Sequence, residues 1–153
     1  MKSPLRLPLL AGLCVLALAT VAAEPAVLVY QRNGKGYVHD NLDASAAAIR
    51  ELGERHGFKV DATKDPVVFA DATLAKYQAL IFANSNNEAF DTDDQRAAFQ
   101  RFLARGGGFV GLHSSTGSER EWTEFQRVQG AKFLRHPPLQ LFTIDVRDRT
   151  HPA

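Results

Sequence analysis

Cysteine is almost absent from this sequence, and its scarcity excludes whole classes of chemistry. The single cysteine of the 153 residues is Cys14, which lies in a segment that we expect to be removed. Small exported proteins often rely on disulfides, and a mature chain without Cys14 can form none. It also has no thiol nucleophile. A packed core must therefore stabilise the fold.

Long apolar runs are also scarce. The uncharged run Leu7–Ala23 is shorter than the roughly 20 residues that cross a bilayer, and Pro8 interrupts it. Two basic residues precede the run, and Val21-Ala22-Ala23 supplies the small residues that signal peptidase requires. The pattern predicts a signal peptide over residues 1–23 and a periplasmic or secreted mature chain. A membrane anchor is the alternative interpretation.

Neither sign of charge dominates the remaining chain. Without Lys2 and Arg6, the 18 basic residues fall to 16, against 17 acidic residues, for a formal charge of −1. Nucleic acids and anionic membranes bind basic clusters, and no basic stripe is present. We therefore expect a small neutral or weakly charged ligand, with no nucleic acid and, after signal cleavage, no membrane as partner. The oligomeric state is not indicated.

Short apolar runs alternate with segments of helical periodicity. The predicted strands are Ala26–Tyr30, Phe58–Ala62, Gln78–Ala83, Gly108–His113 and Leu139–Val146. The predicted helices start after Asp40 or Asn41 and stop at Gly57, run from Thr92 to Gly106, and cross Glu119–Gln129. Between the second and third strands, Asp65–Lys76 is expected to be a loop with a short helical turn.

This alternation predicts the fold class. Strands separated by helices of this length pair in parallel through right-handed crossovers. The sequence therefore predicts an α/β three-layer sandwich with a mostly parallel sheet. A flavodoxin-like strand order, 2-1-3-4-5, is assumed for it. The chain stops directly after the last predicted strand, without a helix to cover it. We therefore expect residues 24–153 to be the N-terminal part of a domain that is truncated here.

Three polar loops follow predicted strands and suggest where a ligand binds. They are Asn33–Asp40, Asn84–Glu88 and His113–Ser118, after the first, third and fourth strands. Ligands of open parallel sheets bind outside the carboxyl ends of the strands, where the strand order reverses. If these three strands are neighbours, the loops converge on one crevice.

The segment Gly106–Ser115, GGGFVGLHSS, contains the strongest candidate for a catalytic residue. His113 lies where the strand turns, the place where related α/β folds hold a nucleophile. A neutral imidazole can act as a base, a proton shuttle or a metal ligand. A histidine that only orders the turn fits the same position.

His39 is a second candidate, in the glycine-flanked loop beside Asp40. Together with His113 it can bind a divalent metal such as zinc, although a catalytic zinc normally has three protein ligands. The alternative is a solvated or capping loop residue. His136, before two prolines, is interpreted as a turn residue.

Amides, hydroxyls and the single tryptophan supply further ligand-binding candidates. Asn84 and Asn86 can bond sugar hydroxyls, with turn chemistry as the alternative. Ser114 stands at a helix start, where a cap is a more common role than a nucleophile, and the backbone N–H groups there can hold an anion or a sugar hydroxyl. Trp122 can stack on a sugar ring, although anchoring its helix is the more common role.

Longer motifs resemble a known family. They are VLVYQRNGKGYVHDN, RELGERHGFKVDAT, and GGGFVGLHSS followed by Glu119 and Trp122. In these motifs the chain resembles the ThuA-like (trehalose utilisation) family from Ala26 to Ala153. That family has a fold similar to class I glutamine amidotransferases. Without a thiol, this chain is not expected to be an amidotransferase.

The resemblance implies a role in carbohydrate metabolism, with hydrolysis or cleavage of a disaccharide or a keto-glycoside. In this hypothesis His113 is the general base or a metal ligand, and His39 is its partner. The residues expected to contact the small-molecule carbohydrate are Gly36, Tyr37, Asn84, Asn86, Ser114, Glu119 and Trp122. A non-catalytic sugar-binding module with the same crevice is the alternative.

Overall fold

The computed structural model describes residues 23–151, and the predicted signal peptide lies outside them except for Ala23. Four parallel strands form one sheet: β1 (Ala26–Tyr30), β2 (Lys59–Thr63), β3 (Ala79–Ala83) and β4 (Gly108–Leu112). Their order is β2-β1-β3-β4. The α/β class and the order of the first four strands are confirmed. Within the described residues, no helix combines the length and apolar character needed to cross a membrane.

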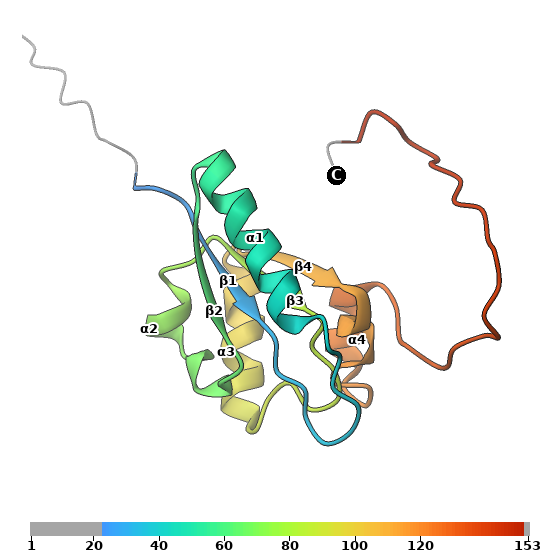
Figure 1. The fold of residues 1–153 in the computed structure, drawn as a ribbon. Coiled ribbons are helices and arrows are strands. Elements are labelled where there is room, and N and C mark those ends of the chain that lie inside the picture. Colours follow the sequence, from blue (N-terminus) through green and yellow to red (C-terminus); the bar gives the residue numbers. More distant parts are fainter. Residues whose placement is uncertain (1–22, 152–153) are drawn as a thin grey trace, which may run out of the picture.

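The helices pack on both faces of this sheet (Figure 1). The longer ones are α1 (Leu42–His56), α3 (Asp93–Ala104) and α4 (Thr123–Gln129). Short turns fill the predicted loop and the end of β4: η1 (Pro66–Val68), α2 (Asp71–Leu74) and η2 (His113–Gly117). The strands are short and each is followed by a helical segment, which produces the predicted three layers.

Alternating strand residues divide the core between the two faces. Leu28, Leu80 and Phe82 pack with Phe99 of α3 and Phe125 of α4 in an aromatic cluster. The intervening residues of the same strands face α1, whose Ile49 packs on Val29 and Ala83. Because successive side chains of a strand point to opposite faces, one sheet builds both cores.

The ends of the helices follow from their capping residues. Thr92 accepts a hydrogen bond from the N–H of Gln95, whose side chain returns to the backbone of Thr92. Gly57 stops α1 in the left-handed conformation with φ 72°. These caps fix where α1 ends and where α3 begins.

Two predicted elements are wrong in the structure. Leu139–Val146 forms no strand and lies exposed along a segment that leads away from the body (Figure 1). Its alternating apolar residues suit a strand, but a strand also needs a partner for its backbone, and β4 remains an edge strand here. The helix predicted to begin at Glu119 begins at Thr123, because Glu119 has φ 47° and cannot continue a right-handed helix.

Candidate functional site

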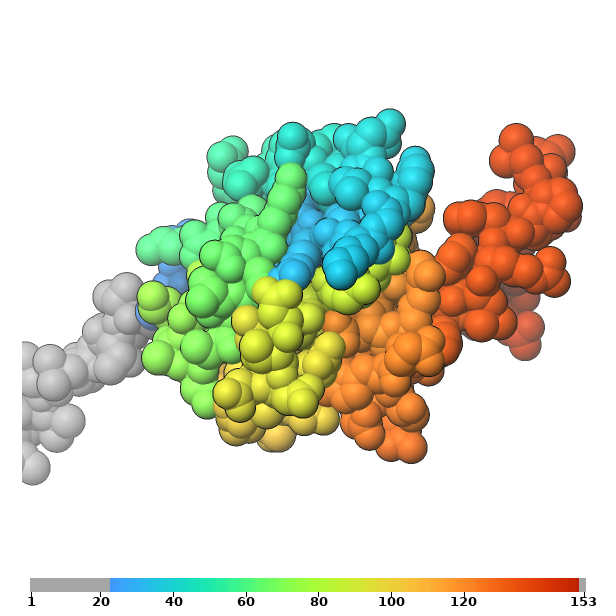
Figure 2. Space-filling model, turned by 90° about the horizontal axis from the view of Figure 1, so that it is seen from below, coloured from blue at the N-terminus to red at the C-terminus, as the bar shows by residue number. Residues whose placement is uncertain are grey.

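The loops after β1, β3 and β4 meet at the carboxyl edge of the sheet, as predicted. Backbone bridges join Asn33 to Asn86 and Asn87 to Ser118. The N–H of Gly34 donates to the carbonyl of Asn86 at 3.0 Å, and the N–H of Asn87 donates to Gly117 at 3.0 Å. Figure 2 looks onto this edge, where the three loops lie side by side in cyan, yellow-green and orange. Their backbones therefore continue the strand pairing past the sheet and hold the site together.

Residues whose backbone is in the left-handed region gather at this edge. Among the described residues, the non-glycine positions with positive φ are Asn84, Asn87, His113 and Glu119, with φ between 47° and 59°. All four lie just past the ends of β3 and β4. Such a conformation costs roughly 1 kcal/mol or more for a residue with a Cβ, less for asparagine. Backbone strain is thus concentrated where the polar loops converge.

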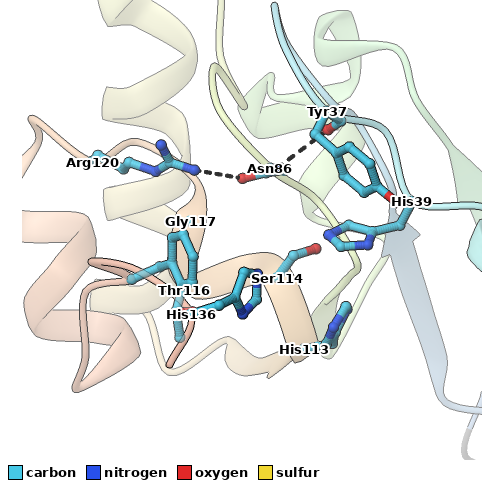
Figure 3. Close-up of a pocket in the computed structure, with 10 residues that line it drawn as sticks. Tyr37, His39, Asn86, His113, Ser114, Thr116, Gly117, Arg120 and His136 are labelled. Carbon is cyan, nitrogen blue, oxygen red and sulfur yellow. Dashed lines mark hydrogen bonds between the residues drawn. The ribbon is translucent and has the colours of Figure 1, made fainter. Parts of the chain in front are cut away.

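A cavity of about 630 Å³ opens between these loops and the segment after α4 (Figure 3). Its walls combine predicted and unpredicted residues: Tyr37, His39, Asn86, His113, Ser114, Thr116, Gly117, Arg120, Phe133 and His136. Neither aspartate nor glutamate is among them. The cavity thus brings together both predicted histidines with five further residues that the sequence did not single out as ligand-binding.

The orientation of His113 is set by a chain of polar contacts. Its Nδ1 lies 2.9 Å from Oδ1 of Asn84. The amide nitrogen of Asn84 donates to the hydroxyl of Ser45 at 2.6 Å, which leaves the amide oxygen to face the histidine. An amide oxygen can only accept, so Nδ1 carries the proton and Nε2 has the free lone pair. Asn84 thus lies behind the cavity wall and positions His113.

His39 stands directly beside His113. The ring centroids are 4.5 Å apart, edge to face, and Tyr37 contacts His39 from another side at 4.9 Å. Burial lowers the pKa of His39, and the nearby His113 lowers it further; Asp40 raises this pKa by less than His113 lowers it, and His136 adds the smallest lowering effect. His39 is therefore neutral near pH 7 and can accept or donate one hydrogen bond.

The two histidines do not form a three-ligand metal centre. Within residues 23–151, no group of three or more His, Cys, Asp or Glu side chains is arranged to hold a metal ion. A catalytic zinc normally takes three protein ligands and a water. In the part of the chain that the structure describes, the side chains around the two histidines do not fit that donor set.

The remaining loop candidates divide into cavity and non-cavity positions. Asn86 lies in the wall, where its amide donates to the carbonyl of Tyr37 at 3.3 Å. Ser114 also lies in the wall, and its hydroxyl is buried without a hydrogen-bond partner. Ser115 is fully buried and donates to Gln129 at 3.3 Å, which is not the position of a nucleophile. Gly36 does not line the cavity but approaches the side chain of Asn87.

Glu119 and Trp122 point away from the histidines. The carboxylate of Glu119 accepts the backbone N–H groups of Ala89 at 2.9 Å and Phe90 at 3.1 Å, and it pairs with Arg96 at 2.9 Å. Trp122 packs on Phe90 and other rings of the core. Both residues line a separate hollow of about 570 Å³. Trp122 thus packs against the core, as a helix anchor does, and also borders the second hollow.

Part of the cavity wall was not expected from the sequence. Arg120 follows Glu119 in the irregular turn before α4, and its Nη2 donates to Oδ1 of Asn86 at 3.2 Å. Phe133 stacks beneath the Arg120 guanidinium at 5.4 Å and is tied by its N–H to the carbonyl of Thr116 at 2.9 Å. His136 contacts Phe133. The sequence hints at this part of the wall only through residues 131–138, which contain two prolines and show no helical pattern.

Comparisons with known proteins agree with this architecture. The model of the ThuA family, described as trehalose utilisation, matches residues 26–153. The crystal structure of a ThuA-like protein from Bacteroides uniformis ATCC 8492 is similar, with a TM-score of 0.54 and 23% sequence identity. The similarity covers 72% of this chain and 46% of that chain, so this chain spans less than half of that length. At this identity the likeness shows the fold alone. A comparison with curated proteins gives no match.

Proposed function

Because the chain belongs to the ThuA (trehalose utilisation) family, we propose that it hydrolyses or otherwise cleaves a disaccharide or a keto-glycoside. We also propose that it acts in the periplasm or outside the cell, after removal of residues 1–23. The observation that carries the catalytic part is the contact between His113 and Asn84 on the cavity wall. A cavity of about 630 Å³ falls within the usual size of small-molecule sites.

His113 acts as the general base in this proposal. Its Nδ1 proton is directed to Asn84, so the lone pair on Nε2 can take a proton from the reacting group. Asn84 fixes the tautomer through a neutral amide and places no negative charge beside the ring. His39, neutral and in ring contact, is the partner that can accept or donate a hydrogen bond to the substrate.

The composition of the wall favours proton abstraction over two-carboxylate hydrolysis. Most glycosidases use a pair of Asp or Glu side chains at the scissile bond, and the described cavity wall has neither. In a keto-glycoside, Nε2 removes the acidic proton on the carbon next to the ketone. The electron pair then expels the glycosidic oxygen, which takes a proton and leaves. For a plain disaccharide, the base instead removes a proton from a water molecule, whose oxygen bonds to the anomeric carbon as the glycosidic bond breaks, and the leaving oxygen takes a proton from solvent.

The test is turnover of a panel of disaccharides and keto-glycosides, followed by NMR of the released sugar. His113→Asn suits the left-handed backbone at this position and removes the base. We expect turnover to fall by roughly 10²- to 10⁴-fold while the dissociation constant changes little. His56→Asn is the matched control, because His56 is exposed at the end of α1.

Two results would contradict the proposal in different ways. If His113→Asn keeps its turnover, the reaction does not use this base. If the unaltered chain binds sugars and turns over none of them, the non-catalytic sugar-binding module is the better description. No sugar binding at all would remove both functions.

A further inference from the structure

Arg120 occupies an unusual position for a half-buried arginine. It lies in the cavity wall, where its guanidinium donates to Asn86 (Figure 3). The guanidinium also lies over the ring of Phe133, 5.4 Å from its centroid. The contact with Asn86 uses one N–H group, and the Nε atom is buried without a hydrogen-bond partner. An arginine has five N–H donors, so most of its hydrogen-bonding capacity is unused.

The other half-buried arginines of the described residues show what is missing. Arg32 pairs with the carboxylate of Asp91. Arg96 pairs with Glu119 at 2.9 Å and with Asp93 at 2.8 Å. Arg120 has no carboxylate partner among residues 23–151, although it is similarly withdrawn from solvent. Taking a charge partly out of water is costly unless a partner compensates it.

On the cavity side, the surroundings of Arg120 share this deficit of negative charge, whereas its other side borders the second hollow, whose lining includes Glu119 and Glu121. The described wall contains one arginine and three histidines, and no carboxylate. The buried hydroxyl of Ser114 also has no hydrogen-bond partner in the same wall. Arg120 therefore brings to this wall a positive charge that no carboxylate of the wall offsets.

We infer that the natural ligand carries an anionic oxygen group, a carboxylate or a phosphate, which Arg120 binds in the cavity. The inference rests on the proposed function and makes it narrower: the ligand is a sugar acid or a sugar phosphate. A guanidinium presents parallel N–H groups that match the two oxygens of such an anion. Asn86 and Phe133 hold the guanidinium in place before the ligand arrives, and Ser114 can add a further hydrogen bond.

The experiment is isothermal titration calorimetry of the whole chain with D-glucuronate, D-glucose 6-phosphate and D-glucose. We expect one of the two anionic sugars to bind at least about tenfold more tightly than glucose. Arg120→Gln should lower the affinity for that anionic sugar by roughly tenfold to a hundredfold and leave the affinity for glucose unchanged. Arg127→Gln on α4, which is exposed, is the matched control and should change neither.

Arg120→Lys is a second variant, which keeps the test informative if Arg120→Gln does not fold. It keeps the charge and loses the paired N–H groups, so its affinity for the anion should lie between those of the unaltered chain and Arg120→Gln. Equal affinity for glucose and both anions would overturn the inference and leave the sugar function intact. Binding of inorganic phosphate that depends on Arg120, without binding of any sugar, would support the anion site and contradict the proposed function.

Discussion

Replacing Glu119 by alanine should destabilise the chain strongly, because this carboxylate satisfies groups that have no other partner. It is 7% exposed and accepts the N–H groups of Ala89 and Phe90, residues that are 0% and 2% exposed. A buried N–H left unpaired costs about 1–3 kcal/mol. The Arg96 pair adds less than about 1 kcal/mol, since that arginine is partly solvated and keeps Asp93.

Together these losses predict a decrease of about 3–5 kcal/mol in the free energy of unfolding. That is a large part of the roughly 5–15 kcal/mol that stabilises a typical domain. Urea denaturation followed by circular dichroism measures it as a lower midpoint. Glu121→Ala is the matched control, because its side chain is 95% exposed and pairs only with Lys132, at 3.6 Å. It should change stability by about 0.5 kcal/mol or less.

The two variants would refute the reasoning if they were equally stable. Glu119→Gln separates a structural role from a ligand role, because the amide keeps one oxygen for both backbone N–H groups. We expect it to bind sugars as the unaltered chain does. A tenfold loss of sugar affinity without loss of stability would mean that Glu119 contacts the ligand after all.

Two further predictions concern stability at acidic pH and the space around Gly107, which precedes β4. The pKa of His39 is lowered in the folded chain, so below pH 6.5 the unfolded chain binds a proton at His39 more readily than the folded chain does. The free energy of unfolding therefore decreases as the pH decreases. His39→Gln should therefore lose less stability than the unaltered chain between pH 6.5 and 5 in urea titrations, and His56→Gln should not share this gain. A methyl group at Gly107 would overlap the ring of Phe102, so Gly107→Ala should lower stability by about 1–3 kcal/mol. Gly57→Ala meets no neighbouring atom and should cost only about 1–2 kcal/mol for its left-handed backbone; an equal or larger loss there would argue against the overlap.

The sheet could be predicted because its information is local. Three of the strands, β1, β3 and β4, are short apolar runs between polar turns, and β2 (KVDAT) is a more polar segment. The helical segments between the strands make the pairing parallel, and the assumed flavodoxin-like order then places the strands. The predicted meeting of three loops follows from that order. Leu139–Val146 has the same local pattern without a partner for its backbone, and pattern alone cannot distinguish the two situations.

The candidate site was predictable only where it lies at strand ends. His113 and Asn84 follow β4 and β3 directly, so their proximity could be expected. Arg120 could not be placed, because its position depends on the left-handed turn at Glu119 that delays α4. The hydrogen bond between His113 and Asn84 joins residues 29 positions apart, and no periodicity encodes it.

The left-handed positions at the carboxyl edge limit which amino acids the chain can accept as it evolves. Glycine would relieve the backbone at His113 and Glu119, and it is the replacement that folding alone would favour. β-Branched residues would be the worst tolerated there. A non-glycine residue at such a position has to offset the cost of its positive φ through the contacts of its own side chain. Glu119 makes such contacts inside the protein, with Ala89, Phe90 and Arg96, whereas His113 is exposed and makes its contacts, with Asn84 and His39, at the wall of the cavity.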